Sequence, residues 1–302
     1  MDASVELVKR LLPVVVHIHT QVPSAHPSAR MLGDERAGTG TVIDPNGLIL
    51  TVNYVVMGGE TIHVSFAKGR TQRAELVAQD FEMGLALLKV KRTGLPAVPV
   101  SSSEDLDRGE PVFAVAATGP RDRRVSGGLL TYLGEFEAYW EYMLERSLVS
   151  TVSSPGPGGG PLFTLTGRMV GVASLNLGEI VRTSLAIPGE CYLSNRADYL
   201  RHGRAASRAP RAWLGVFAHP LEEGVMVAGL VPGGPGAKCG IKEGDVIVSL
   251  DTLQVPTRKE LYLSLWRRGP GERIELEVMR DSKLKRLDVT GGNRADFYKQ
   301  IS

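Results

Sequence analysis

The sequence predicts a mainly β protein of two domains, in which a β-barrel or sandwich is followed by a smaller β unit. Three observations lead to this prediction. The chain has 302 residues, more than a typical single domain. Short hydrophobic runs with turn residues between them fill its first two thirds. A basic, proline-containing stretch at 204–210 then precedes a differently built remainder. We therefore expect domains at 1–203 and 211–302, joined by a linker at 204–210.

The expected elements follow from local patterns in chain order. Apolar residues recur at helical spacing over 3–12, and a proline at 13 stops that helix. Strands begin at 14–20, and DPNG at 44–47 predicts a tight hairpin turn. Glycine and proline number 35 and 18, which favours many turns. A further helix is expected over about 190–202, just before the linker.

The second domain has its own pattern of elements. Strands and turns are expected first, and then a short helical turn that ends at Gly240. The run TRKELYLSLWRR predicts a helix with Thr257 as its N-cap, because a threonine side chain can accept a hydrogen bond from a free amide of the first turn. Two alternating runs near the end predict a closing hairpin.

Composition excludes several classes of function. The net charge of +2 and the lack of a basic block give no support to a nucleic-acid partner. No apolar stretch approaches about 18 residues, so no membrane span is expected. The first twenty residues lack the features of a signal peptide. We therefore expect a cytoplasmic protein as written, and a periplasmic or extracytoplasmic one if the natural chain is longer at its N-terminus.

Cysteine and histidine give no strong sign of a metal or cofactor. Cys191 and Cys239 fall in different domains, so two reduced thiols are expected rather than a disulfide between domains. His17 and His19 share one face of a strand. A metal there would need a third ligand, and none is in view, so we expect ordinary strand residues, no metal and no cofactor.

Several longer runs then resemble a known family. GTGTVIDPNGLILTVNYVV, LALLKV, PGPGGGPLF, GRMVGVAS and LAIPGE resemble the protease domain of the HtrA family of trypsin-like serine peptidases, in the family's order and spacing. WLGV, GVMVAGLVPGGPGAKCGIKEGDVIVSLD and RRGPGERIELEVMRD resemble that family's PDZ domain. The resemblance implies a trypsin-like double β-barrel followed by a PDZ domain, a β-sandwich with two helices.

The resemblance breaks down at the three positions that carry the family's chemistry. The histidine position is Tyr54, in TVNYVV. The aspartate position is Gly84, in GLALL. The serine position is Gly158, in GPGGGPL. Serine hydrolysis needs a nucleophile, a base and a carboxylate that orients the base. These residues supply none of the three, since a phenol with a pKa of about 10 is a poor base at neutral pH.

Substitute groups are poorly placed in the sequence. Ser154 lies four residues before the serine position and Ser153 one further. Glu82 lies two residues from position 84, a displacement of about 6–7 Å along a strand, too far for direct contact. The nearest histidine in sequence, His63, belongs to another strand. The sequence therefore predicts a pseudoprotease, a degenerate homologue that is not an enzyme.

The glycine loop still carries backbone donors. In the family the amides matching Gly156 and Gly158 form an oxyanion hole, so both are oxyanion-hole-like candidates here. Either the glycines merely allow the turn geometry, or the loop binds a carbonyl or carboxylate. Val152 stands where trypsin-like enzymes set specificity, which implies an apolar pocket.

Two further regions are candidates for binding. The acidic, aromatic segment 132–147 either packs on the barrel or forms a binding surface. The resemblance implies that Leu214, Gly215 and Val216 bind a peptide's C-terminal carboxylate through their amides. It also implies that Leu261 and Leu265 wall the groove, although both leucines could equally belong to the core.

Together these observations predict an inactive HtrA-like homologue that binds peptides or unfolded polypeptides as a scaffold, chaperone or regulator in protein quality control. Peptide C-termini, unfolded proteins and an active HtrA relative are the expected partners. Two alternatives stay open: an HtrA-family endopeptidase with residual or rearranged catalysis, and a purely structural subunit. Family members are often trimers held by N-terminal segments. Because that segment is short here, a homo-oligomer is also left open.

Overall fold

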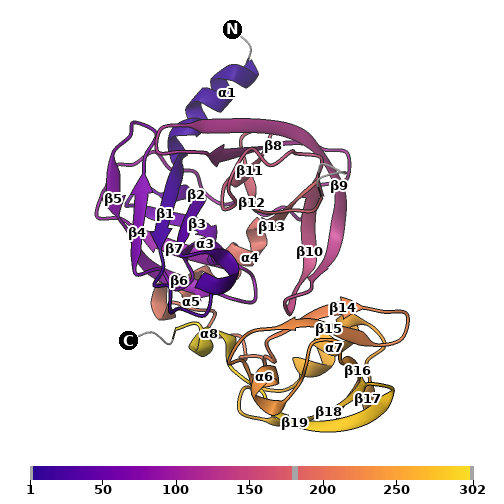
Figure 1. Ribbon diagram of the computed structural model, residues 1–302. Helices are drawn as coiled ribbons and strands as arrows, with labels where there is room; N and C mark the ends of the chain where they lie inside the picture. The colour runs from indigo at the N-terminus through magenta and orange to yellow at the C-terminus, as the bar shows by residue number, and fades with distance from the viewer. Residues whose placement is uncertain (1–2, 179–182, 300–302) are drawn as a thin grey trace. The chain divides into compact units, whose positions relative to one another are not determined.

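The computed structural model describes residues 3–178 and 183–299, and the chain divides into two compact units. Unit 1 comprises Met1–Glu135 and Leu144–Ser207, and unit 2 comprises Phe136–Met143 and Arg208–Ser302. Both units are built mainly from strands, which confirms the predicted fold class (Figure 1). Unit 2 is therefore built from two parts of the chain. One is the short stretch Phe136–Met143, which interrupts unit 1 in sequence, and the other is the C-terminal part from Arg208.

Unit 1 begins with a seven-stranded antiparallel sheet of order β5-β4-β1-β2-β3-β7-β6 (Figure 1). Its strands are β1 (Val15–Gln21), β2 (Glu35–Asp44), β3 (Leu48–Val52), β4 (Thr61–Ser65), β5 (Thr71–Arg73), β6 (Glu75–Asp80) and β7 (Leu85–Lys89). The helices of this part are α1 (Ala3–Leu11), the 3-10 turn η1 (Leu12–Val14), α2 (Ala29–Leu32) and α3 (Asn53–Val56).

The second half of unit 1 is a closed barrel of order β10-β13-β12-β11-β8-β9. Its strands are β8 (Pro111–Ala117), β9 (Arg123–Ala138), β10 (Tyr142–Ser150), β11 (Pro161–Thr164), β12 (Met169–Asn176) and β13 (Ser184–Pro188). Aliphatic side chains fill the barrel, among them Val152. The position expected to shape an apolar pocket is thus part of the core.

Two local features of unit 1 relate directly to the sequence prediction, the turn at 44–47 and the helical region 190–202. At 44–47 the carboxylate of Asp44 accepts a hydrogen bond of 2.8 Å from the amide of Asn46, and Gly47 takes a φ of +90° that suits glycine. The single helix expected over 190–202 is instead two, α4 (Gly189–Leu193) and α5 (Arg196–His202). Asn195 lies between them with non-helical backbone angles.

Unit 2 contains a sheet of order β14-β15-β16-β18-β19, with β17 paired to β16. Its strands are β14 (Val216–Pro220), β15 (Val225–Leu230), β16 (Val246–Leu250), β17 (Leu253–Gln254), β18 (Arg273–Arg280) and β19 (Lys283–Thr290), and its helices are α6 (Pro235–Cys239), α7 (Arg258–Leu265) and α8 (Arg294–Phe297). The core lies between the sheet and α7, and burying its apolar side chains is the main stabilising contribution to this unit.

Helix α7 begins at the predicted N-cap. The hydroxyl of Thr257 accepts a hydrogen bond from the amide of Glu260 and lies 2.7 Å from the Glu260 carboxylate. The hydroxyl thereby satisfies one of the amides that a helix start leaves free, and it donates its own proton to the Glu260 carboxylate. Cys191 and Cys239 are both free thiols. Within residues 3–178 and 183–299, no helix is long and apolar enough to cross a membrane.

Candidate functional site

The structure brings the three expected reactive positions together in unit 1. An added Cβ atom at Gly158 would lie only 2.0 Å from the phenol oxygen of Tyr54. The amide of Asn53, next to Tyr54, donates a 2.8 Å hydrogen bond to the carbonyl of Gly84. Gly84 itself has a φ of +73°, in the left-handed region that favours glycine. The three positions are therefore neighbours, as the resemblance implies, but they carry one phenol and no other side-chain group.

Tyr54 acts as a structural hydrogen-bond donor in this arrangement. It projects from the short helix α3, and its hydroxyl donates to the carbonyl of Ser174 at 2.7 Å. Burial raises the pKa of Tyr54 to about 12, because the phenolate would lose its solvation. The ring is therefore neutral at physiological pH and fills the space above Gly158.

The glycine loop between β10 and β11 is tied to strand β2 by one residue. The amide of Thr39 donates to the carbonyl of Gly158, and its hydroxyl donates to the carbonyl of Pro157, both at 2.8 Å. Gly159 has a φ of +99°, and a Cβ atom there would lie 2.1 Å from the carbonyl oxygen of Thr39. Only glycine fits at position 159, so the close contact of loop and strand depends on it.

The loop's candidate donors remain predictions. Gly156 and Gly158 are both half-buried, as expected for residues at the edge of a site. The nearby hydroxyl of Ser154 donates to the carbonyl of Gly156 at 2.8 Å, so it helps to shape the turn. Ser153 is exposed to solvent. The oxyanion-hole-like role of the two amides stays an expectation of the resemblance.

A second polar group near Tyr54 was missed by sequence reasoning. Nδ1 of His26 and the hydroxyl of Ser28 lie 2.6 Å apart, and the guanidinium of Arg36 donates to the same hydroxyl at 2.7 Å. Arg36 also donates to the carbonyls of Tyr54 and Met57, each at 2.9 Å. All three side chains are buried, and burial lowers the pKa of Arg36 to about 10. This group stabilises the backbone around Tyr54 and lies out of reach of a substrate.

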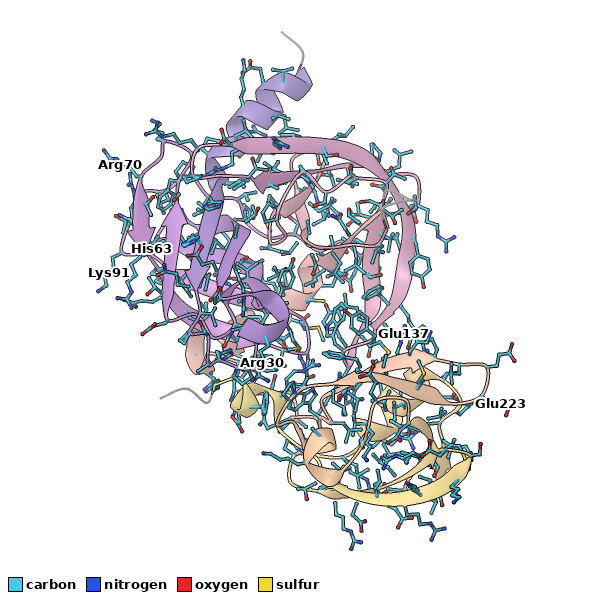
Figure 2. The ribbon with its side chains drawn as sticks, viewed as in Figure 1. Arg30, His63, Arg70, Lys91, Glu137 and Glu223 are labelled. Atoms are coloured by element: carbon cyan, nitrogen blue, oxygen red, sulfur yellow. The ribbon has the colours of Figure 1, made fainter. Side chains whose placement is uncertain are left out.

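The predicted histidine pair lies on β1, and it faces a third histidine. His19 is the cross-strand partner of His63 on β4, which Figure 2 labels. His17 is buried, and its pKa is lowered by desolvation, by Arg123 and by His19. Among the described residues, no cluster of three or more His, Cys, Asp or Glu side chains has the arrangement of a metal site.

The predicted carboxylate-binding amides of unit 2 all point at one carboxylate. The amides of Gly215 and Val216 donate to Oε1 of Glu141 at 2.7 and 2.9 Å, and the amide of Leu214 donates to Oε2 at 3.0 Å. Gly215 has a φ of +77°, which turns its amide in the same direction as its neighbours. Burial raises the pKa of the Glu141 carboxyl, while Arg294 and the three amides act in the opposite direction. Leu214, Gly215 and Val216 thus form a carboxylate site within unit 2.

Helix α7 presents a residue to this site that the sequence pattern did not single out. Leu261 and Leu265 are fully buried in the core of unit 2. Between them in sequence, Tyr262 directs its hydroxyl at the backbone of the Glu141 segment, donating to the carbonyl of Ala138 at 2.7 Å and accepting from the amide of Glu141 at 3.0 Å. Burial raises the pKa of Tyr262, which keeps the hydroxyl protonated and able to donate. The two leucines at i, i+4 therefore share a helix face that packs into the core of unit 2.

Comparison with known proteins identifies both units. A trypsin-like peptidase domain model matches residues 38–172, and a PDZ domain model matches residues 212–290. A probable periplasmic serine endoprotease DegP-like protein of Halomonas elongata is 32% identical over 90% of this chain and 60% of its own length. A protein of the same description from Ectopseudomonas mendocina is 30% identical over 92% of this chain and 60% of its own length. The chain thus spans about 60% of the length of these relatives.

Solved structures agree with this assignment. A variant of the HtrA-type protease AlgW, solved with a decapeptide, is 25% identical, covers 97% of this chain and 98% of its own, and has a TM-score of 0.59. A serine endoprotease from Yersinia pestis has the same TM-score at 24% identity, over 97% of this chain and 98% of its own. The neighbours share the fold over almost the whole chain.

These comparisons correct one expectation. The prediction that the chain is not an enzyme, made from Tyr54, Gly84 and Gly158, is wrong: relatives at about 30% identity over most of the chain are named serine endoproteases, which points to an enzyme. The physical flaw lay in reading activity from three side chains alone. Backbone donors and substrate binding contribute to hydrolysis separately from the triad, and part of the rate enhancement survives without it.

The comparisons also give no support to a cytoplasmic location, since the relatives are named periplasmic.

Proposed function

Because the chain joins an HtrA-type trypsin-like peptidase domain to a PDZ domain, we propose that it binds polypeptides at the amides of Leu214, Gly215 and Val216. One observation carries the proposal: three consecutive amides converge on a single carboxylate at 2.7–3.0 Å. Such a set of backbone donors suits the carboxylate at a peptide's C-terminus, and the adjoining strand β14 offers backbone groups for β-strand addition. The AlgW variant solved with a decapeptide supports this function by analogy.

By binding peptides in this way, the protein would act as a scaffold, chaperone or regulator in protein quality control. Its partners in the proposal are peptide C-termini and unfolded polypeptides, together with an active HtrA relative. We place this activity in the periplasm, the compartment given in the names of the relatives.

The test is a binding measurement on the full chain. Fluorescently labelled peptides from a library with free C-terminal carboxylates should bind, and the same peptides with amidated C-termini should bind at least about tenfold more weakly, since charge-assisted hydrogen bonds are the stronger ones. Equal binding of acid and amide forms would contradict carboxylate recognition.

Endoproteolysis is the second candidate function, favoured by the names of the relatives. The neutral phenol of Tyr54 is a poor base, so hydrolysis by this chain would use other groups. The hydroxyls of Ser153 and Ser154 in the glycine loop are the nearest candidates in sequence to Gly158. A time course with fluorescent casein tests this function. Turnover that is lost in a Ser153→Ala, Ser154→Ala double variant supports it, and a rate equal to the uncatalysed background contradicts it.

A further inference from the structure

We propose that residues 137–141 occupy the peptide groove of unit 2 as an internal ligand, with the side-chain carboxylate of Glu141 in the place of a peptide's C-terminal carboxylate. This inference rests on the proposed peptide-binding function and adds a regulation of that same site. The segment comprises the last two residues of β9 and the connection to β10, and it belongs to unit 2 although most of both strands belongs to unit 1. Glu137, labelled in Figure 2, lies at its start.

The carboxylate of Glu141 fills the site completely. Glu141 is 3% exposed, and its two oxygens accept all three amide hydrogen bonds of the loop. Its backbone φ of 55° lies in the left-handed region, which is unfavourable for a residue with a side chain. The favourable contacts of the carboxylate therefore hold the backbone in a strained turn.

The backbone before Glu141 makes a main-chain hydrogen bond to strand β14 at the edge of the sheet. The carbonyl of Tyr139 accepts a 2.7 Å hydrogen bond from the amide of Ala218 on β14. The ring of Tyr139 meets the ring of Phe217 edge-on, with centroids 5.7 Å apart. A main-chain hydrogen bond to a sheet edge, with a side-chain contact beside it, is a feature of peptide recognition by β-strand addition.

Side chains on the helices of unit 2 bind the remaining backbone of the segment. From α7, Arg258 donates to the carbonyl of Glu137 at 3.1 Å, and its Nε lies 3.4 Å from the Glu137 carboxylate, an ion-pair distance without hydrogen-bond geometry. Tyr262 makes the two contacts to Ala138 and Glu141 described above. From α8, Arg294 donates to the carbonyls of Trp140 and Glu141. Two positively charged side chains thus favour an acidic segment.

Occupation by a tethered segment has a direct consequence for other ligands. A covalently linked ligand acts at an effective concentration in the mM range, so a free peptide has to displace it. The observed affinity for a free peptide is the intrinsic affinity multiplied by the fraction of molecules with an open groove. If more than about 90% of molecules hold the segment, releasing it should tighten peptide binding at least about tenfold.

The test compares the wild-type chain with Glu141→Ala, and with Glu141→Gln as a second variant that keeps the side-chain size. Glu145→Ala is the matched control, because it removes one negative charge from the exposed face of β10. The probes are a labelled synthetic peptide of residues 134–143 with an amidated C-terminus, the same peptide with glutamine for Glu141, and the carboxylate-terminated library.

Expected results are specific to the carboxylate. The amidated 134–143 peptide should bind Glu141→Ala at least about tenfold more tightly than it binds wild type or Glu145→Ala, and its glutamine form should bind more weakly. Hydrogen exchange at the amides of 214–216 should be slow in wild type and faster in Glu141→Gln, a readout that needs no added peptide.

Two other outcomes separate this inference from the function on which it rests. If library peptides bind wild type and Glu141→Ala with equal affinity, the groove is open, and the internal-ligand proposal is overturned while peptide binding stands. If neither chain binds any probe while both remain folded by circular dichroism, the proposed peptide-binding function fails, and the internal ligand fails with it.

Discussion

Replacing Gly158 by alanine is expected to destabilise the protein, because the new methyl group and the phenol of Tyr54 cannot occupy the same space. The added carbon would lie 2.0 Å from the Tyr54 oxygen and 2.8 Å from the carbonyl of Ser174. Tyr54 must therefore move, which breaks its hydrogen bond to Ser174. The same obstacle applies to a serine at this position, so Tyr54 and a nucleophile at 158 exclude each other.

The magnitude follows from three contributions. Overpacking a filled site costs about 1–3 kcal/mol, and loss of the Tyr54 hydrogen bond costs about 1 kcal/mol. Alanine offsets about 0.5–1 kcal/mol by restricting the unfolded chain, since Gly158 does not have a positive φ. The expected loss is about 1–3.5 kcal/mol of unfolding free energy, measured from urea unfolding followed by far-UV circular dichroism.

A double-mutant cycle identifies the cause. In a Tyr54→Ala background the same Gly158→Ala change should cost at least about 1 kcal/mol less, because the phenol is gone. Gly127→Ala is the matched control, since an added carbon there would meet only one atom, at 3.9 Å, and its cost should be near zero. An equal cost of Gly158→Ala in both backgrounds would refute the reasoning.

Three further predictions concern single contacts. Since burial raises the pKa of Tyr54 from 10.0 to about 12, its contribution is fully present below pH 10 and is lost as the pH rises through about 12. The free energy of unfolding should then fall by up to about 2.7 kcal/mol more in wild type than in Tyr54→Phe, and a parallel decline in both would contradict this. Thr257→Ala should cost about 1 kcal/mol by removing the N-cap of α7, measured by tryptophan fluorescence in urea; no change would show that the cap is unimportant. Arg280→Met should lower the free energy of unfolding, because it leaves the carboxylate of Asp245 without its 2.5 Å partner. A loss under about 1 kcal/mol, the range of an exposed ion pair, would contradict that account.

Local features of the fold could be predicted from the sequence. The turn at 44–47 and the N-cap at Thr257 depend on residues within three or four positions of each other, and both are confirmed. The helix expected over 190–202 is interrupted at Asn195, a residue whose side chain competes for backbone groups. Its amide side chain donates to the carbonyl of Cys191, which favours the break.

The contact between Glu141 and the amides of 214–216 could not be predicted in this way. Glu141 meets amides that lie 73 to 75 positions further along the chain, and no local pattern reports such a contact. The acidic, aromatic composition of 132–147 did indicate a packing or binding segment, but not what it binds. Likewise, leucines spaced i, i+4 on α7 reveal one face of the helix, while the contacts to Ala138 and Glu141 are made by Tyr262 between them.

Thr39 has a consequence for how unit 1 transmits a disturbance. Besides its two bonds to the glycine loop, its hydroxyl accepts from the amide of Ala117 on β8, and its carbonyl accepts from the hydroxyl of Thr51 on β3. Through its hydroxyl and its backbone, this one residue links the seven-stranded sheet, the barrel and the loop. A molecule that displaces the loop acts directly on its two bonds to Thr39, and Thr39 is the residue through which such a displacement reaches β3 and β8.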